Sequence, residues 1–155
     1  MLIKKFILVV MMFSALTIAA PAGAKQPAPL EPPAGCSCTE CGMNVQGDAL
    51  KFVSEIIDKN GKASFFCDIG DLMAFYDVMK KRQDAVAIYV RDYASGAWMD
   101  ARTCVFLSGT NVKTPMRYGI LAFKDRAAAG KFKKANGGEG VYTLDEAVRA
   151  KVFKR

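Results

Sequence analysis

The apolar positions of the chain change period several times between residues 50 and 95. Residues 50–58 form an apolar run typical of a strand, and residues 63–67 form a second one after the Asn-Gly turn of a hairpin. A helix is predicted next, because apolar side chains then recur on one helical face. These side chains are Leu72, Phe75, Tyr76 and Met79. Alternation resumes over residues 86–90, so this half predicts the order strand, strand, helix, strand.

The second half of the chain repeats that order. Strands are predicted over residues 99–107 and 118–123. A helix follows, with Asp125 placed to cap its first turn and an Asn-Gly-Gly sequence to end it. After a short strand, the capping box Thr143-Leu-Asp-Glu146 opens a last helix. The sequence thus predicts an α+β fold of two fused ββαβ units.

The N-terminus has the pattern of a secretory signal peptide over residues 1–24. Two lysines precede an apolar stretch, and Ala22-Gly-Ala24 matches a cleavage site. The apolar stretch is shorter than the roughly 20 residues of a membrane-spanning helix, so we expect export to the periplasm with cleavage after Ala24. Membrane association through an uncleaved signal is the alternative.

The rest of the chain is expected to be one domain behind a linker. The Pro-rich residues 25–35 predict an extended linker with nothing to bury. Residues 36–155 then hold the two halves, at about 36–95 and 96–155. The formal charge of the 155 residues is +7, and the cations are scattered rather than arranged in a stripe with exposed aromatic rings. We therefore expect no nucleic-acid partner.

Sulfur is concentrated in the stretch Cys36-Ser-Cys38-Thr-Glu-Cys41-Gly-Met43, and the chain has no histidine. Soft thiolate and thioether ligands favour Cu(I), whereas thiolate alone also suits Zn(II). The Cys38-x-x-Cys41 pair can chelate a metal, form a disulfide, or both. Glycine lets the backbone turn tightly, so that Cys41 and Met43 can converge on one ion. The stretch therefore predicts a Cu(I) site, with Cys36 as an additional candidate ligand.

The sequence also resembles the NosL family, the accessory proteins of nitrous-oxide reductase. The resemblance begins at Cys41-Gly-Met43 and continues, in order, through four further segments: Phe65-Phe-Cys-Asp-Ile-Gly-Asp71, Trp98-Met-Asp-Ala-Arg102, Thr114-Pro-Met116, and residues 122–138. It implies a periplasmic Cu(I)-binding protein of duplicated ββαβ units that helps to deliver copper to the reductase or its assembly machinery. No enzymatic turnover of its own is expected. The fold is expected to be distantly related to organomercurial lyase.

What the family resemblance implies for single residues is narrower. It makes Cys41 and Met43 ligands of the metal, and we expect Met116 to be a ligand contributed by the second half. Asp100 and Arg102 are expected to form a buried pair. Cys104 lies in an alternating strand and is expected to be a buried apolar residue.

Two other interpretations of the thiols stay open at this stage. Cys67 could join Cys36, Cys38 and Cys41 in a structural zinc site, because such sites are usually closed by four Cys or His ligands. Alternatively, the thiols and Asp71 could belong to an enzyme, either a thiol oxidoreductase or a lyase that cleaves mercury–carbon bonds. Such a lyase needs two thiolates and an acid close together.

Overall fold

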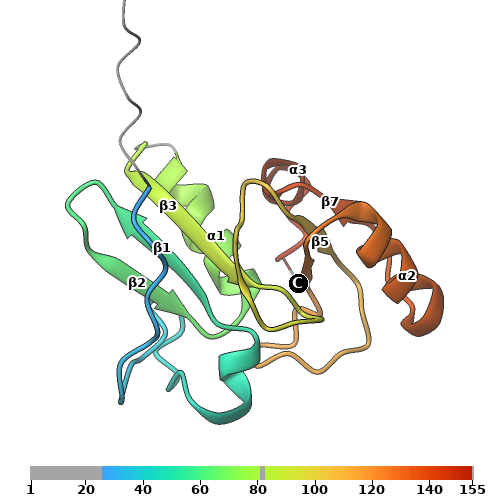
Figure 1. The fold of residues 1–155 in the computed structure, drawn as a ribbon, viewed down its shortest axis with the longest axis horizontal. Helices are drawn as coiled ribbons and strands as arrows, with labels where there is room; N and C mark the ends of the chain where they lie inside the picture. Colours follow the sequence, from blue (N-terminus) through green and yellow to red (C-terminus); the bar gives the residue numbers. More distant parts are fainter. Residues whose placement is uncertain (1–25, 81–82, 155) are drawn as a thin grey trace, which may run out of the picture.

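A computed structural model describes residues 26–80 and 83–154 of the chain (Figure 1). The predicted signal peptide, residues 1–24, lies outside the described residues. Across the part that is described, no helix combines the length and the apolar character needed to cross a membrane.

The first sheet has four antiparallel strands in the order β2-β1-β3-β4. Its strands are β1 (Ser54–Asp58), β2 (Ala63–Phe66), β3 (Ala85–Arg91) and β4 (Trp98–Asp100). Helix α1 (Ile69–Lys80) covers one face of this sheet, and the apolar side chains of that face lie in the main core with those of α1 (Figure 1).

The second sheet has three strands in the order β6-β5-β7. Its strands are β5 (Val105–Leu107), β6 (Leu121–Phe123) and β7 (Val141–Tyr142), and α2 (Arg126–Asn136) packs on all three. Helix α3 (Leu144–Arg149) contacts α1 as well as β5 and β7, so it joins the two halves. A short 3₁₀ helix, η1 (Gly47–Lys51), precedes β1.

The two sheets share one topology, which confirms the predicted α+β fold. In each, the first strand is central, with the second strand on one side and the strand after the helix on the other. The single strand predicted over residues 99–107 is wrong, because it is two strands in different sheets: β4 pairs with β3, and β5 is the centre of the second sheet. Between them Ala101 donates its N–H to Ile88, and the chain turns.

The predicted helix boundaries follow from local capping. Asp125 accepts a hydrogen bond from the N–H of Ala128 at 2.7 Å, and Thr143 with Glu146 forms the expected capping box. Helix α1 opens at Asp68, whose Oδ1 accepts the N–H of Gly70 at 3.1 Å. Such side-chain acceptors satisfy N–H groups that have no partner within the helix.

The region around β4 corrects one expectation and confirms another. Asp100 and Arg102 do not form a buried pair, because Arg102 is exposed and its guanidinium donates to the carbonyls of Ala85 and Val86. Asp100 instead accepts the backbone N–H of Arg102 at 2.8 Å. Cys104 is buried, as predicted, and only 3% exposed.

Residues 26–35, which we call the strap, are not the free linker that their prolines predict. The strap lies along the face of the first sheet opposite α1 (Figure 1). The N–H of Leu30 donates to the buried Glu55 at 3.0 Å. Glu31 pairs with Arg91 and accepts the indole N–H of Trp98 at 2.8 Å. The strap is held through its backbone and one carboxylate rather than an apolar pattern, so hydrophobic periodicity gives no sign of it.

Replacing Glu31 with Gln should loosen the strap. Trp98 is the only tryptophan, so its fluorescence emission should shift to longer wavelength as the indole meets water. The free energy of unfolding should fall by roughly 0.5 kcal/mol, because the pair is partly exposed. The Trp98 hydrogen bond lowers the pKa of Glu31, so this stabilisation is complete above the pKa of an unfolded glutamate and is lost as the pH falls through the lowered value.

The matched control for this variant is Glu40→Gln, an exposed glutamate in the same region of the chain. It should leave the emission of Trp98 unchanged. Equal emission shifts in the two variants would contradict the docking of the strap through Glu31.

Candidate metal centre

The cysteine-rich stretch folds into a small hairpin over residues 36–45. The N–H of Val45 donates to the carbonyl of Cys36 at 2.8 Å, and the N–H of Cys38 donates to the carbonyl of Met43 at 2.7 Å. The loop closes with Gly42, whose φ of +75° lies in the left-handed region that favours glycine. This bend brings Cys38 and Cys41 into one cluster, so the predicted turn before Met43 is present.

The hairpin packs on the start of α1. The N–H of Thr39 donates to the carbonyl of Phe65 at 2.8 Å, which fastens the loop to the end of β2. Two residues later Cys67 precedes the cap residue Asp68, and Asp71 lies in the first turn of the helix. The helix N-terminus carries partial positive charge, which stabilises a thiolate or carboxylate beside it.

Four side chains from these two segments converge. The sulfurs of Cys38, Cys41 and Cys67 and a carboxylate oxygen of Asp71 all lie within 4.8 Å of one another. Oδ2 of Asp71 is 3.3 Å from the sulfur of Cys38 and 3.5 Å from that of Cys67, and the sulfurs of Cys41 and Cys67 are 3.5 Å apart. Cys38, Cys67 and Asp71 are buried, whereas Cys41 is partly exposed, so Cys41 is the side of the cluster that solvent reaches.

The four groups cannot all be ionised, because like charges this close oppose one another. The hydrogen bond from the Cys67 thiol, with backbone N–H groups of Cys41 and Cys67, lowers the pKa of Cys38 to about 4. Burial raises the pKa of Cys41 to about 11, and the bond to Cys38 raises that of Cys67. Burial also raises the pKa of Asp71. These shifts favour ionisation of Cys38 before its neighbours, and a bound cation would be needed to ionise the remaining groups together.

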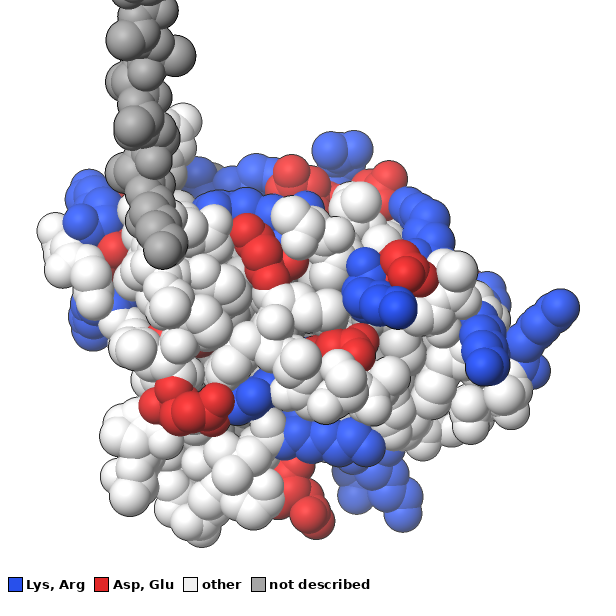
Figure 2. Space-filling view, viewed as in Figure 1, with Lys and Arg blue, Asp and Glu red and all other residues white. Residues whose placement is uncertain are grey.

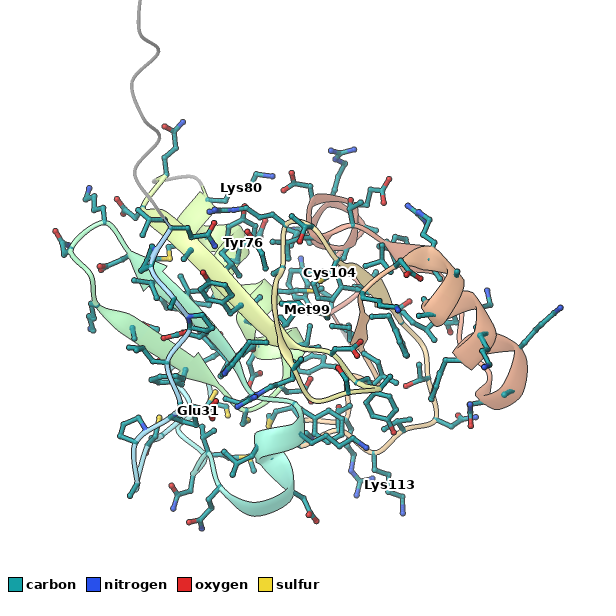
Figure 3. All side chains as sticks on the ribbon, in the orientation of Figure 1. Glu31, Tyr76, Lys80, Met99, Cys104 and Lys113 are labelled. Atoms are coloured by element: carbon teal, nitrogen blue, oxygen red, sulfur yellow. The ribbon has the colours of Figure 1, made fainter. Side chains whose placement is uncertain are left out.

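The other predicted ligands surround this cluster at different depths. Met43 is 46% exposed at the turn of the hairpin, directly after the glycine that follows Cys41. Met116 is partly buried against the main core, and its N–H donates to Asp68 at 2.9 Å, so its loop is fastened one residue from Cys67. Their roles as ligands stay predictions. In Figure 3, Glu31 marks the end of the first sheet where several sulfur atoms gather.

Cys36 lies outside the cluster. Its thiol donates to the carbonyl of Ser37 at 3.7 Å, and burial raises its pKa. The four-cysteine set considered for zinc is therefore not assembled among the described residues: three cysteines meet one carboxylate. The sequence predicts Asp71 only as part of an enzyme site and not as a metal ligand. Cys67 precedes α1, so its four-residue spacing from Asp71 does not by itself predict a shared helix face, and their approach depends on the fold.

Comparison with known proteins identifies the family and a similar structure. The sequence profile of the NosL family matches residues 29–152, which is most of the chain. The chain belongs to the NosL family. Its structure is similar to the crystal structure of the copper chaperone NosL from Shewanella denitrificans, with a TM-score of 0.69 and 24% sequence identity, covering 82% of this chain and 99% of that one. This likeness concerns the fold. No curated protein sequence matches the chain.

The left-handed bend at Gly42 gives a direct test of this NosL site. Nothing lies within 4 Å of a Cβ built at Gly42 or at Gly61, and both have a φ near +75°. Changing either to Ala should cost about 1 kcal/mol of stability from backbone strain alone. Only Gly42→Ala should also weaken metal binding, since Gly61 turns the β1–β2 hairpin. Equal metal affinity in the two variants, measured by chelator competition, would show that the bend does not position the thiols.

Proposed function

We propose that this NosL protein carries Cu(I) as a cargo and acts as a metallochaperone rather than an enzyme. The observation that carries the proposal is the convergence of three cysteine sulfurs within 4.8 Å, one of them partly exposed. Three soft sulfurs suit Cu(I). The similar protein from Shewanella denitrificans is a copper chaperone, which supports the same conclusion.

The exposure of the cluster favours a carrier over a closed structural site. Cys41 is partly exposed and Met43 is 46% exposed, so the edge of the site faces solvent, where another protein's ligands can reach the ion. Structural zinc sites are closed by four ligands, and removal of the zinc ion unfolds small domains. Here the surrounding domain has a large core of its own, in which Phe66, Leu72 and Ile88 are fully buried.

We further propose that the protein works in the periplasm and supplies copper for the maturation of nitrous-oxide reductase. The signal-like N-terminus and membership of the NosL family support this. A reporter fusion that is active only after export tests the location. Deletion of the gene should leave the reductase, purified from the same cells, short of copper.

Anaerobic titration with Cu(I) against a chromogenic chelator tests the proposed cargo. Cys41→Ser should weaken Cu(I) binding by at least about tenfold, because it removes one of the three sulfurs of the cluster. Cys36→Ser, which removes a thiol outside the cluster, should leave the affinity unchanged. Met43→Leu should weaken binding less than Cys41→Ser does. If Cys41→Ser binds Cu(I) as tightly as the unaltered protein does, the cysteine cluster is not the Cu(I) site.

The same titration distinguishes copper from zinc through Asp71. Zn(II) also accepts carboxylate oxygen and would take all four donors, whereas Cu(I) favours the sulfurs. Asp71→Asn should therefore weaken Zn(II) binding and leave Cu(I) binding nearly unchanged. The opposite order would identify the site as a zinc site.

The affinity for Cu(I) should rise with pH. The raised pKa values of Cys41 and Cys67 mean that both thiols hold protons at neutral pH in the metal-free protein. Metal binding must displace these protons, so it becomes weaker as the pH falls. Proton release on addition of Cu(I), measured with an indicator dye in weak buffer, checks the sign. A pH-independent affinity with no proton release would contradict the protonation state described above.

One specific observation favours a second candidate, the cleavage of mercury–carbon bonds. The Asp71 carboxyl lies within 3.5 Å of two of the three thiols, and burial raises its pKa. Two thiolates would bind the mercury of an alkylmercury cation, and the protonated Asp71 would give its proton to the carbon as the mercury–carbon bond breaks. The hydrocarbon leaves, the mercury stays on two sulfurs, and Asp71 becomes a carboxylate. Hydrocarbon release from methylmercury, lost in Asp71→Asn, would establish this activity, and its absence would exclude it.

A further inference from the structure

An open groove lies in the second half of the protein, beside α2. It has a volume of about 340 Å³ and is lined mainly by apolar side chains. We call it the α2 groove; its lining includes Ala94, Phe123, Ala128, Lys131, Phe132 and Ala135. None of these residues belongs to the cysteine cluster, so the metal site does not account for it.

The floor of the groove is a packed set of aromatic rings. The centroids of Phe123 and Phe132 are 5.3 Å apart, and Tyr93 lies 5.3 Å from Phe132 and 6.0 Å from Phe123. Phe123 is buried and Phe132 is partly buried, so the apolar surface is recessed below the rim. A preformed recess of this kind receives an inserted side chain without first reorganising.

The segment that borders the groove is rich in basic residues, and one of them, Lys131, is part of the lining. Residues 124–136 contain five basic residues and one acidic residue, and the acidic one, Asp125, is the helix cap. In the part of the chain that the structure describes, Lys124, Lys131 and Lys134 are exposed and form no ion pair. Figure 2 shows Lys and Arg side chains at the end of the molecule where α2 lies. An occupant of the groove therefore meets the charge of Lys131, which none of the ion pairs among the described residues balances.

The recessed apolar surface of the α2 groove, with Lys131 in its lining, fits a peptide better than a membrane. Proteins that bind membranes insert protruding apolar side chains into the lipid. The exposed large apolar residues among those described, Leu30, Met43, Leu50, Val78 and Val86, all lie outside the α2 groove. We propose that the α2 groove binds an acidic segment of a partner protein, which inserts one aromatic or large aliphatic side chain and pairs a carboxylate with Lys131.

The probe for this proposal is a fluorescein-labelled peptide with one central Phe and two Glu residues on each side. The purified protein should bind it, as measured by fluorescence anisotropy. Replacing the Phe with Ser, or the Glu residues with Lys, should weaken binding by at least about tenfold. Added salt should also weaken it, because the lysines are exposed. Equal binding of all three peptides would overturn the proposal.

Two pairs of matched variants locate the binding surface. Ala135→Trp should fill the groove and abolish peptide binding, whereas Ala127→Trp, also exposed on α2 but outside the lining, should not. Lys131→Gln should weaken binding several-fold more than Lys133→Gln, whose lysine lies outside the lining and donates to the carbonyl of Glu139. Equal effects within either pair would overturn the proposal.

Two measurements separate this result from the metal site and from lipid. Ala135→Trp should titrate with Cu(I) like the unaltered protein, so loss of peptide binding cannot be mistaken for loss of the fold or of the metal site. Vesicles of phosphatidylcholine with phosphatidylserine should not compete with the peptide. Vesicle binding that Ala135→Trp abolishes together with peptide binding would assign the groove to lipid instead.

Discussion

The structure around the cysteines depends on how much negative charge one buried place can hold. Three thiols and a carboxyl lie within 4.8 Å of one another at the N-terminus of α1. The helix end and the donors around Cys38 favour its ionisation, and the bond to Cys38 raises the pKa of Cys67. Such a cluster favours the binding of a cation, because only a positive ion allows the remaining donors to ionise together. The burial of these four groups thus supports the proposed binding of a cation.

The second half of the chain fixes the position of that centre without supplying a cysteine to it. Asp68 caps α1 with one oxygen and accepts the N–H of Met116 with the other. A Cβ on Gly70 would lie 2.1 Å from the ring of Tyr118, so glycine allows the loop before β6 to cover the helix start. The first turn of α1, which holds Asp71 one turn beyond Cys67, is therefore clamped between the hairpin and this loop. The second ββαβ half therefore helps to hold Asp71 beside the cysteines of the first half.

The elements that the sequence predicts best are those whose chemistry is local. The caps Asp125 and Thr143 act within three residues, and an Asn-Gly turn acts within two. What could not be predicted depends on distant partners. Glu31 meets Trp98 across 67 positions, so the strap looked like a free linker. The residues from β4 to β5 alternate as one strand, but alternation carries no information about which sheet a strand joins. Cys38 and Cys41 were found through their spacing, whereas the approach of Asp71 needed the fold.

The packing also separates the metal centre from the α2 groove. Cys38 and Cys67 belong to the main core, which runs through α1 and α3, whereas Phe123 and Ala129 belong to a distinct cluster under α2. Phe52 is in that second cluster although it follows η1 directly, and its ring lies 6.2 Å from Tyr93. The segment after the cysteine hairpin therefore ends in the aromatic packing beneath the groove. A partner bound in the α2 groove would lie over the aromatic cluster that includes Phe52, which follows the cysteine hairpin and η1. The thiols themselves lie in the other core cluster. Substitutions in the α2 groove can therefore change the proposed docking without altering the core that holds the proposed metal centre.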